Sequence, residues 1–234
     1  MIFCRSLLFA LWFAAVTIVM GTLALPLLLG PRQGALWLSS CWAKATLWGL
    51  KLFAGIDMRV AGTVPKQPVL IAAKHMSTWD TLAIHIVLGD PGIVLKRSLL
   101  LIPFFGWYVG KTAAIPIDRG GGASTLRNMA REARDVLAQG RPVVIFPEGT
   151  RKKPGAPPDY KPGVAGLYGQ LGVACVPVAH NSGAYWRGFW KHPGTITLAF
   201  LDPIPPGLKR AEFMPILEER IETATTRLLR DVTR

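Results

Sequence analysis

Acidic residues and cysteines are both scarce in this chain of 234 residues. Asp and Glu number 14 against 27 Lys and Arg, so the formal net charge is +13. This surplus favours an anionic partner. Nucleic acid, a lipid headgroup and a phosphorylated ligand all qualify, and the charge alone does not choose among them. The three cysteines, Cys4, Cys41 and Cys175, lie far apart without a CxxC pair. Their spacing argues against a disulfide framework and a zinc site and fits a reducing compartment.

Charged residues of either sign are also few, at 18% of the chain, whereas hydrophobic residues make up 50%. The mean hydropathy is +0.33. These values argue against intrinsic disorder and against an ordinary soluble domain. The length suffices for one large domain or two small ones with a sizeable core.

The N-terminal region holds much of the apolar excess, since no charged residue occurs from Ser6 through Pro31. As one helix the stretch would measure about 39 Å, more than the roughly 30 Å hydrocarbon core of a bilayer. It is too long for the apolar region of a signal peptide, and no A-x-A cleavage site follows it. The next segment, 34–56, mixes Leu and Trp with Lys44 and Lys51 and is predicted to be interfacial. Two arrangements stay open: both helices enter one leaflet as a hairpin, or the first spans the bilayer and the second lies flat.

The chain is therefore expected to comprise membrane-anchoring helices in residues 1–56 and a folded domain in residues 57–234. Four of the five basic residues before position 60 follow the apolar run, namely Arg32, Lys44, Lys51 and Arg59. By the positive-inside rule, this distribution places the rest of the chain on the cytoplasmic side.

After residue 57, short β-branched runs alternate with longer helical stretches, which predicts an α/β domain with a mixed central sheet flanked by helices. The expected strands are 58–60, 69–73, 92–95, 113–117, 143–146, 175–178 and 195–200. The expected helices are 78–88, 123–139, 164–171 and 209–232. Glycines follow the first three of these helices, as is common at helix ends.

His75 and Asp80 stand five residues apart where the strand 69–73 gives way to the helix 78–88. Ligand-binding and catalytic groups gather at the carboxyl ends of strands in such sheets. A carboxylate in the first helical turn can accept a hydrogen bond from Nδ1, which leaves Nε2 as a general base. The structural interpretation is that Ser77 caps the helix, Asp80 completes a capping box and His75 packs nearby. Spacing alone favours the structural interpretation.

The other familiar catalytic patterns are missing from the sequence. Ser77 has no G-x-S-x-G elbow around it and is not expected to be a nucleophile. His85, His180 and His192 are scattered, without an HExxH motif, so no metal site is predicted.

A second polar loop follows the strand 143–146 and reads Phe146-Pro147-Glu148-Gly149-Thr150-Arg151. Such a loop can present backbone N–H groups, the Thr150 hydroxyl and the Arg151 guanidinium to one anion. The alternative to an anion site is a solvated basic turn without a ligand, and Lys152 and Lys153 by themselves favour this alternative. Glu148 needs a partner, for which Arg151 or a substrate hydroxyl is a candidate.

Three further basic residues, Lys96, Arg97 and Arg119, stand at expected strand ends. Each alone is typical of a solvated strand end. Together they would ring a phosphate pocket.

Four segments stand in the order of the four motif blocks of the glycerolipid acyltransferases: His75-x4-Asp80; residues 96–106 (KRSLLLIPFFG) leading to Ile117-Asp118-Arg119; Phe146 to Arg151; and Val176-Pro177-Val178. From about residue 57 to 207 the chain resembles this family, and within it the bacterial 1-acyl-sn-glycerol-3-phosphate acyltransferases. Tyr160-Lys161-Pro162-Gly163 and Asn181-Ser182-Gly183 are similar to the bacterial members as well. Met76 departs from the pattern, because these enzymes often have Gln or another polar residue there.

This resemblance implies that residues 57–234 form a catalytic domain that makes phosphatidic acid. His75 would take the proton of the sn-2 hydroxyl as it attacks a fatty acyl thioester, while Asp80 orients the imidazole. No covalent acyl-enzyme is then required. It further implies that Arg151, with Lys96 and Arg97, binds the phosphate. Glu148, Gly149 and Thr150 would shape the acceptor site.

The resemblance also implies the partners. The acceptor would be lysophosphatidic acid, the donor an acyl-CoA or acyl carrier protein thioester, and no bound cofactor is expected. Membrane lipids would surround the N-terminal helices at the cytoplasmic face of a bacterial inner membrane.

Three rival functions remain. The acceptor could be lyso-ornithine lipid or another lysophospholipid, because the same motifs serve those enzymes. A non-catalytic protein that binds anionic lipid is a second rival, against which the intact His75 and Asp80 argue. A nucleic-acid binder is disfavoured, because the basic residues are dispersed along an apolar chain without a recognisable binding module.

Overall fold

The structure, a computed structural model, describes residues 1–112, 114–118 and 122–232. The helices are α1 (Ile2–Leu23), α2 (Arg32–Gly49), α3 (Thr78–Leu88), α4 (Phe105–Lys111), α5 (Gly122–Ala138), α6 (Gly163–Leu171), α7 (Ser182–Tyr185) and α8 (Arg210–Arg230). Shorter turns are the 3-10 helices η1 (Leu25–Leu28) and η3 (Arg97–Leu101) and the π-helix η2 (Leu50–Ala54). The strands are β1 (Ile56–Ala61), β2 (Leu70–Ala73), β3 (Gly92–Lys96), β4 (Ile115–Ile117), β5 (Val143–Ile145), β6 (Cys175–His180), β7 (Trp186–Arg187), β8 (Trp190–Lys191) and β9 (Gly194–Phe200).

Seven of these strands form one mixed sheet in the order β1-β9-β6-β2-β5-β3-β4. The five strands from β6 to β4 run parallel to one another. At the other end, β9 is antiparallel to β6, and β1 is parallel to β9. The predicted α/β class with a mixed central sheet is therefore confirmed.

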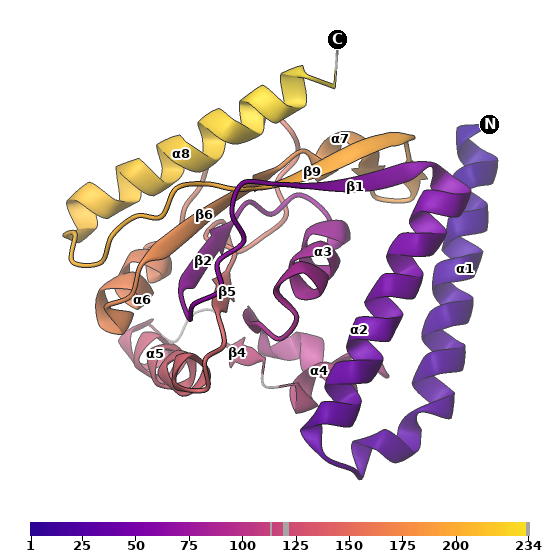
Figure 1. Cartoon of the computed structure of the whole chain (residues 1–234), viewed down its shortest axis with the longest axis horizontal. Coiled ribbons are helices and arrows are strands. Elements are labelled where there is room, and N and C mark those ends of the chain that lie inside the picture. Colours follow the sequence, from indigo (N-terminus) through magenta and orange to yellow (C-terminus); the bar gives the residue numbers. More distant parts are fainter. Residues whose placement is uncertain (113, 119–121, 233–234) are drawn as a thin grey trace.

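Helices cover both faces of the sheet, so its central strands are buried on both sides. Leu70 and Ala72 of β2 pack into a core shared with α5, α6 and α8. Ile71 and Ala73 point the other way, into a core shared with α1, η2 and α3. This is why β2 reads as a continuous apolar run with no alternation. Figure 1 shows α8 on one side of the sheet and the α1–α2 pair on the other.

The parallel arrangement brings four loops to one edge of the sheet. Strands β2, β3, β5 and β6 all point the same way, so their carboxyl ends meet at that edge. The segments that follow these ends begin at residues 74, 97, 146 and 181. Both polar motifs recognised in the sequence lie in these segments.

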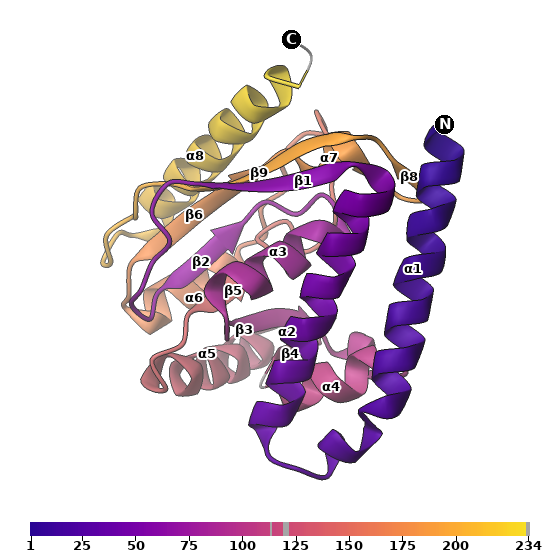
Figure 2. The same ribbon diagram turned by 45° about the vertical axis from the view of Figure 1, so that its right-hand side comes forward.

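Helices α1 and α2 lie side by side in both ribbon views (Figures 1 and 2). Two indole N–H groups connect them: Trp12 donates to the Ala45 carbonyl at 2.9 Å, and Trp42 donates to the Thr17 hydroxyl at 3.0 Å. Phe9 is buried in the same core as the β2 side chains. The two helices thus share a core with the α/β domain, although the sequence separates them as residues 1–56.

The expected strands and helices are found with small changes at their ends. Residue 113, expected to open the fourth strand, lies outside the described residues. Helices α4 and α7 and the hairpin β7–β8 were not predicted. Each of these elements has seven residues or fewer, too short for a hydrophobic period to show in sequence.

Candidate active site

The His75–Asp80 segment satisfies both interpretations of its spacing at once. Ser77 caps α3, accepting the Trp79 N–H at 3.2 Å, and Asp80 completes the capping box. The same Asp80 Oδ2 lies 3.1 Å from His75 Nδ1 and accepts the Met76 N–H at 2.8 Å. The cap therefore holds the carboxylate in the position where it also orients the imidazole.

Asp80 is ionised in this environment. Burial of its fully enclosed side chain would by itself raise its pKa, but hydrogen bonds from His180 and His75 outweigh burial and lower the pKa below the ordinary value. An ionised carboxylate only accepts hydrogen bonds, so Nδ1 of His75 must carry the proton. In a neutral imidazole, Nε2 is then a free acceptor.

The His75 ring is placed to use that acceptor. It stacks on Phe146 with ring centroids 4.2 Å apart, and its side chain is 15% exposed. Within the described part of the chain, Nε2 has no hydrogen-bond partner. A fixed, accessible and unpaired imidazole nitrogen is what a general base requires.

His180 joins this cluster, which the sequence analysis did not foresee when it grouped His180 with the scattered histidines. Its buried ring donates from Nε2 to the Lys74 carbonyl at 2.7 Å and lies 3.4 Å from Asp80 Oδ2. Its Nδ1 accepts the Ser182 N–H at 3.3 Å. The available signal was its position at the carboxyl end of β6, the neighbour of β2.

Glu148 pairs with Lys74, which was not among the partners considered from the sequence, Arg151 and a substrate hydroxyl. The Lys74 ammonium lies 2.7 Å from Glu148 Oε1, and both side chains are buried. Glu148 Oε2 accepts the His75 N–H at 3.2 Å. Both oxygens thus bind protein groups, and the fully buried side chain lies behind the His75 loop.

The rest of the second loop lies against His75 and is open to solvent. Gly149 has φ of +64°, a left-handed conformation that favours glycine, and its N–H closes a turn on the Phe146 carbonyl at 2.9 Å. The Lys152 N–H donates to the His75 carbonyl at 2.8 Å. Thr150 and Arg151, which precede this contact, are exposed. Among the described residues, the Arg151 guanidinium has no ion-pair partner.

The remaining basic candidates differ in how they are paired. Lys96 is exposed at the end of β3, and no described residue forms an ion pair with it. Arg97 binds Asp118, with Nε and Oδ2 2.7 Å apart. Arg119 lies outside the described residues. Of these candidates, Arg151 and Lys96 have no ion-pair partner among the described residues, and both suit an anionic group such as a phosphate.

Within residues 1–112, 114–118 and 122–232, no group of three or more His, Cys, Asp or Glu side chains is arranged to hold a metal ion. The chemistry that the described residues themselves offer is proton transfer at His75, beside a loop that carries the exposed Arg151.

Comparison with known proteins agrees with this geometry. A sequence model of the Acyltransferase family matches residues 56–181. A 1-acyl-sn-glycerol-3-phosphate acyltransferase of Pseudomonas aeruginosa is 36% identical over 198 residues, which cover 82% of this chain and 77% of that protein. A lyso-ornithine lipid O-acyltransferase of the same species is 28% identical over 202 residues, 76% of each chain.

The fold also matches a solved structure, the 1-acyl-sn-glycerophosphate (LPA) acyltransferase PlsC from Thermotoga maritima. The TM-score is 0.76 at 21% sequence identity, over 96% of this chain and 97% of that one. The family match covers more than half of the chain and includes the His75–Asp80 pair, Glu148 and Arg151. The protein therefore belongs to the acyltransferase family.

Proposed function

We propose that this acyltransferase moves a fatty acyl group from a thioester to the sn-2 hydroxyl of 1-acyl-sn-glycerol-3-phosphate, which yields phosphatidic acid for phospholipid biosynthesis. The observation that carries the proposal is that, among the described residues, neither Nε2 of His75 nor the guanidinium of Arg151 in the neighbouring loop has a partner. The 36% identical relative has this activity by name.

In the proposed reaction His75 Nε2 removes the hydroxyl proton as the oxygen attacks the thioester carbonyl. The new C–O bond forms, the C–S bond breaks, and the proton passes from the imidazolium to the departing thiolate. Asp80 stabilises the imidazolium by remaining ionised against Nδ1. A general base contributes about 10²- to 10⁴-fold, so positioning of the two substrates supplies much of the remaining acceleration.

The acceptor phosphate is proposed to bind Arg151, with Lys96 as a second cation. Arg151 has the planar fork that matches phosphate, and the Lys152 N–H bond to the His75 carbonyl keeps it next to the base. Arg97 would have to leave Asp118 to join them. Arg119 remains a proposed phosphate ligand. The turn at Gly149 and the hydroxyl of Thr150 are proposed to shape the acceptor site.

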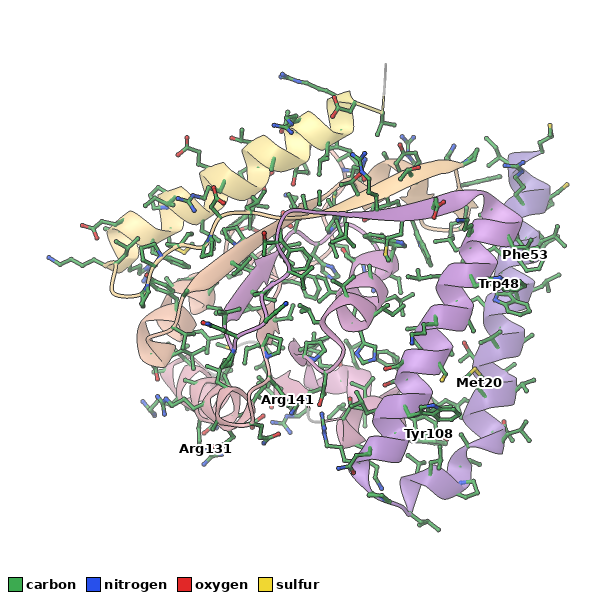
Figure 3. All side chains as sticks on the ribbon, in the orientation of Figure 1. Met20, Trp48, Phe53, Tyr108, Arg131 and Arg141 are labelled. Carbon is green, nitrogen blue, oxygen red and sulfur yellow. The ribbon has the colours of Figure 1, made fainter. Side chains whose placement is uncertain are left out.

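Membrane association is proposed to occur through α1 and α2. Of the described helices, α1 alone is long and apolar enough to cross a bilayer by length and composition. Its outward side chains and those of α2 include many exposed apolar residues: Leu7, Leu8, Leu11, Ile18, Val19, Leu23, Trp37 and Trp48. Figure 3 shows Trp48 on this side of the molecule and Arg131 on the far side. A bilayer is the natural solvent for such a surface.

The packing of α1 favours insertion into one leaflet over a full span. Near its start, Ser6 accepts the N–H of Lys191, and near its end, the Gly21 carbonyl accepts the Tyr108 hydroxyl, both at 2.9 Å. These residues are about 22 Å apart along a helix, so the α/β domain lies alongside most of α1. Spanning would pull charged groups such as Asp90 and Arg141 into hydrocarbon, at a cost of several kcal/mol each.

The donor is proposed to be acyl-CoA or acyl carrier protein, with no bound cofactor. The proposed location is the cytoplasmic leaflet of a bacterial inner membrane, where the distribution of Lys and Arg places the catalytic domain.

The proposal is tested by incubating the purified full chain with a panel of lysolipids and both thioester donors, and identifying the products by mass. Phosphatidic acid as the main product is expected. Because a lyso-ornithine lipid O-acyltransferase is 28% identical to this chain, lyso-ornithine lipid is the second candidate acceptor. If ornithine lipid is the sole product, the acceptor is lyso-ornithine lipid and the proposed acceptor is wrong. If no acceptor is acylated, the proposed reaction is refuted.

Membrane binding is tested with Leu11→Glu, which puts a charge on the exposed face of α1. Co-sedimentation with anionic vesicles should fall strongly, because a charge in the leaflet is costly. Val60→Glu on β1 is the matched control, since Val60 is also an exposed apolar residue but lies outside α1 and α2. Equal losses in both variants would contradict the proposed orientation.

A further inference from the structure

We infer that Glu222, on the C-terminal helix α8, is a positioning residue for His75 that acts through Lys74 and Glu148. The inference rests on the proposed acyl transfer. Helix α8 lies outside residues 56–181, which match the family model, so the family match says nothing about it. In Figure 1 it lies across the sheet from α1 and α2.

The peptide bond between Lys74 and His75 is held from both sides. Its N–H, which belongs to His75, donates to Glu148 Oε2 at 3.2 Å. Its carbonyl, which belongs to Lys74, accepts from His180 Nε2 at 2.7 Å. Both holding side chains are fully buried. The orientation of this peptide fixes where the His75 side chain leaves the backbone, so Glu148 must itself be held in place.

Lys74 holds Glu148 and is held in turn by Glu222. The Lys74 ammonium is 2.7 Å from Glu148 Oε1 and 2.7 Å from Glu222 Oε1, with its side chain 3% exposed. The Tyr160 hydroxyl donates to Glu222 Oε1 at 2.9 Å. Burial and the nearby carboxylates of Glu222 and Glu148 raise the pKa of Tyr160, which keeps this hydroxyl protonated as a donor.

A cavity of about 540 Å³ lies between α8 and the proline-rich segment 153–158, and both Lys74 and Glu222 line it. Glu222 therefore holds the Lys74 ammonium at the wall of this cavity. Without its charge, the flexible Lys74 side chain gains another position, toward the cavity and away from Glu148. Glu148 then holds the His75 amide less firmly, and misplacement of a catalytic group by about 1 Å can cost 10²-fold in rate.

The first test is Glu222→Gln, which keeps the shape and removes the charge. We expect kcat to fall about tenfold, with KM for both substrates changed less than about twofold, because the substrate-binding groups are untouched. Tyr160→Phe should lower kcat by a smaller factor, about threefold, because one neutral donor is lost. Glu219→Gln is the matched control: it lines the same cavity from the same helix, and no described residue binds its carboxylate.

A second test uses the sign of the coupling between Glu222 and Lys74. Lys74→Met leaves two carboxylates without the ammonium between them, and Glu222→Gln then removes one of the unpaired charges. The same substitution should therefore lower kcat in the wild-type background and raise it in the Lys74→Met background. A purely structural role would lower it, or leave it unchanged, in both backgrounds.

The outcomes separate this inference from the proposed function. An inactive wild-type protein would refute the proposed acyl transfer. If the wild type is active but Glu222→Gln and Glu219→Gln have the same kcat, the proposed role of Glu222 is overturned. This holds even if Glu222→Gln has a lower Tm. Loss of kcat in both backgrounds would overturn the route through Lys74. If circular dichroism shows that Lys74→Met is unfolded, the kcat values of Glu222→Gln, Tyr160→Phe and Glu219→Gln decide whether Glu222 has the proposed role.

Discussion

The polar clusters on the two sides of the Lys74–His75 peptide differ in how completely their side chains are paired. On the α8 side, Lys74 is paired with both Glu148 and Glu222, and Tyr160 completes the set. On the α3 side, Asp80 holds His75 through one ring nitrogen only. Within the described chain the other nitrogen has no partner.

The difference separates groups that hold from groups that react. A side chain that is paired within the protein fixes a position, whereas an unpaired group is open to a substrate. A catalytic base needs one fixed nitrogen and one free one, which His75 has. The same distinction applies to two arginines at this edge, since Arg97 is paired with Asp118 and no described residue forms an ion pair with Arg151. Four substitutions test this distinction, in order of decreasing expected effect.

His75→Ala should have the largest effect, a loss of about 10³-fold or more in kcat, because it removes the free acceptor. Stability should change little, since the ring is partly exposed and stands at the edge of the core. Initial rates and a thermal melt of the same preparation measure the two quantities. Substantial turnover in the variant would show that the base lies elsewhere.

Asp80→Asn should lower kcat by about 10²- to 10⁴-fold, since the amide no longer fixes the Nδ1–H tautomer or stabilises the imidazolium. It should also cost about 1 to 3 kcal/mol of stability, because Asp80 accepts backbone N–H groups of the cap.

The stability loss of Asp80→Asn should depend on pH. The folded-state pKa of Asp80 is lowered, so the folded protein binds this proton less readily than the unfolded chain, whose aspartate pKa is about 3.9. The stabilisation is therefore fully present above about pH 4 and is lost as pH falls toward the lowered folded pKa. The stability gap between wild type and variant, measured by urea unfolding, should narrow in acid. A gap that widens in acid would contradict the ionised state.

Arg151→Lys should reduce kcat/KM for lysophosphatidic acid by roughly ten- to a hundredfold, because Lys keeps the charge but loses the planar fork. Monoacylglycerol, which lacks the phosphate, is the control acceptor and should react equally poorly with both proteins. Equal losses with both acceptors would mean that Arg151 supports the loop and does not bind the phosphate.

Arg97→Lys should have the smallest effect, less than about threefold on the same kcat/KM. Its guanidinium already binds Asp118 on the surface, and exposed ion pairs contribute little. A loss as large as that of Arg151→Lys would show that Arg97 leaves Asp118 when the substrate binds. Pairing in the free protein would then be a poor guide to phosphate binding.

The local parts of the fold and the site are predictable from sequence. The helix 78–88 was predicted with the bounds that α3 has, because Ser77 and Gly89 mark its two ends and apolar residues fill it. The His75–Asp80 pair was also predicted, since its hydrogen bond joins residues five apart. Spacing alone favours the cap over the catalytic pair, and the structure shows that the same carboxylate oxygen accepts the Ser77 N–H of the cap and lies against His75 Nδ1.

The contacts that complete the site could not be predicted, because they join residues far apart in the chain. Lys74 meets Glu148 across 74 positions and Glu222 across 148, and His180 reaches the Lys74 carbonyl across 106. For Glu148 the sequence offered Arg151 or a substrate hydroxyl as partners, because only near neighbours are visible in a sequence; the structure pairs it with Lys74. The rule that parallel strands end at one edge could have brought His180 to Asp80, but not Glu222, which arrives on a helix from a separate layer.

The sequence by itself determined the apolar N-terminus, the alternation of strands and helices, and the two motif loops, because each depends on neighbouring residues and their periodicity. Only the tertiary structure decided which polar groups are paired and which are free. It also decided that α1 is attached to the domain near both ends. The physical reason is that pairing depends on strand order and on which face a helix covers, and local backbone preferences set neither of these.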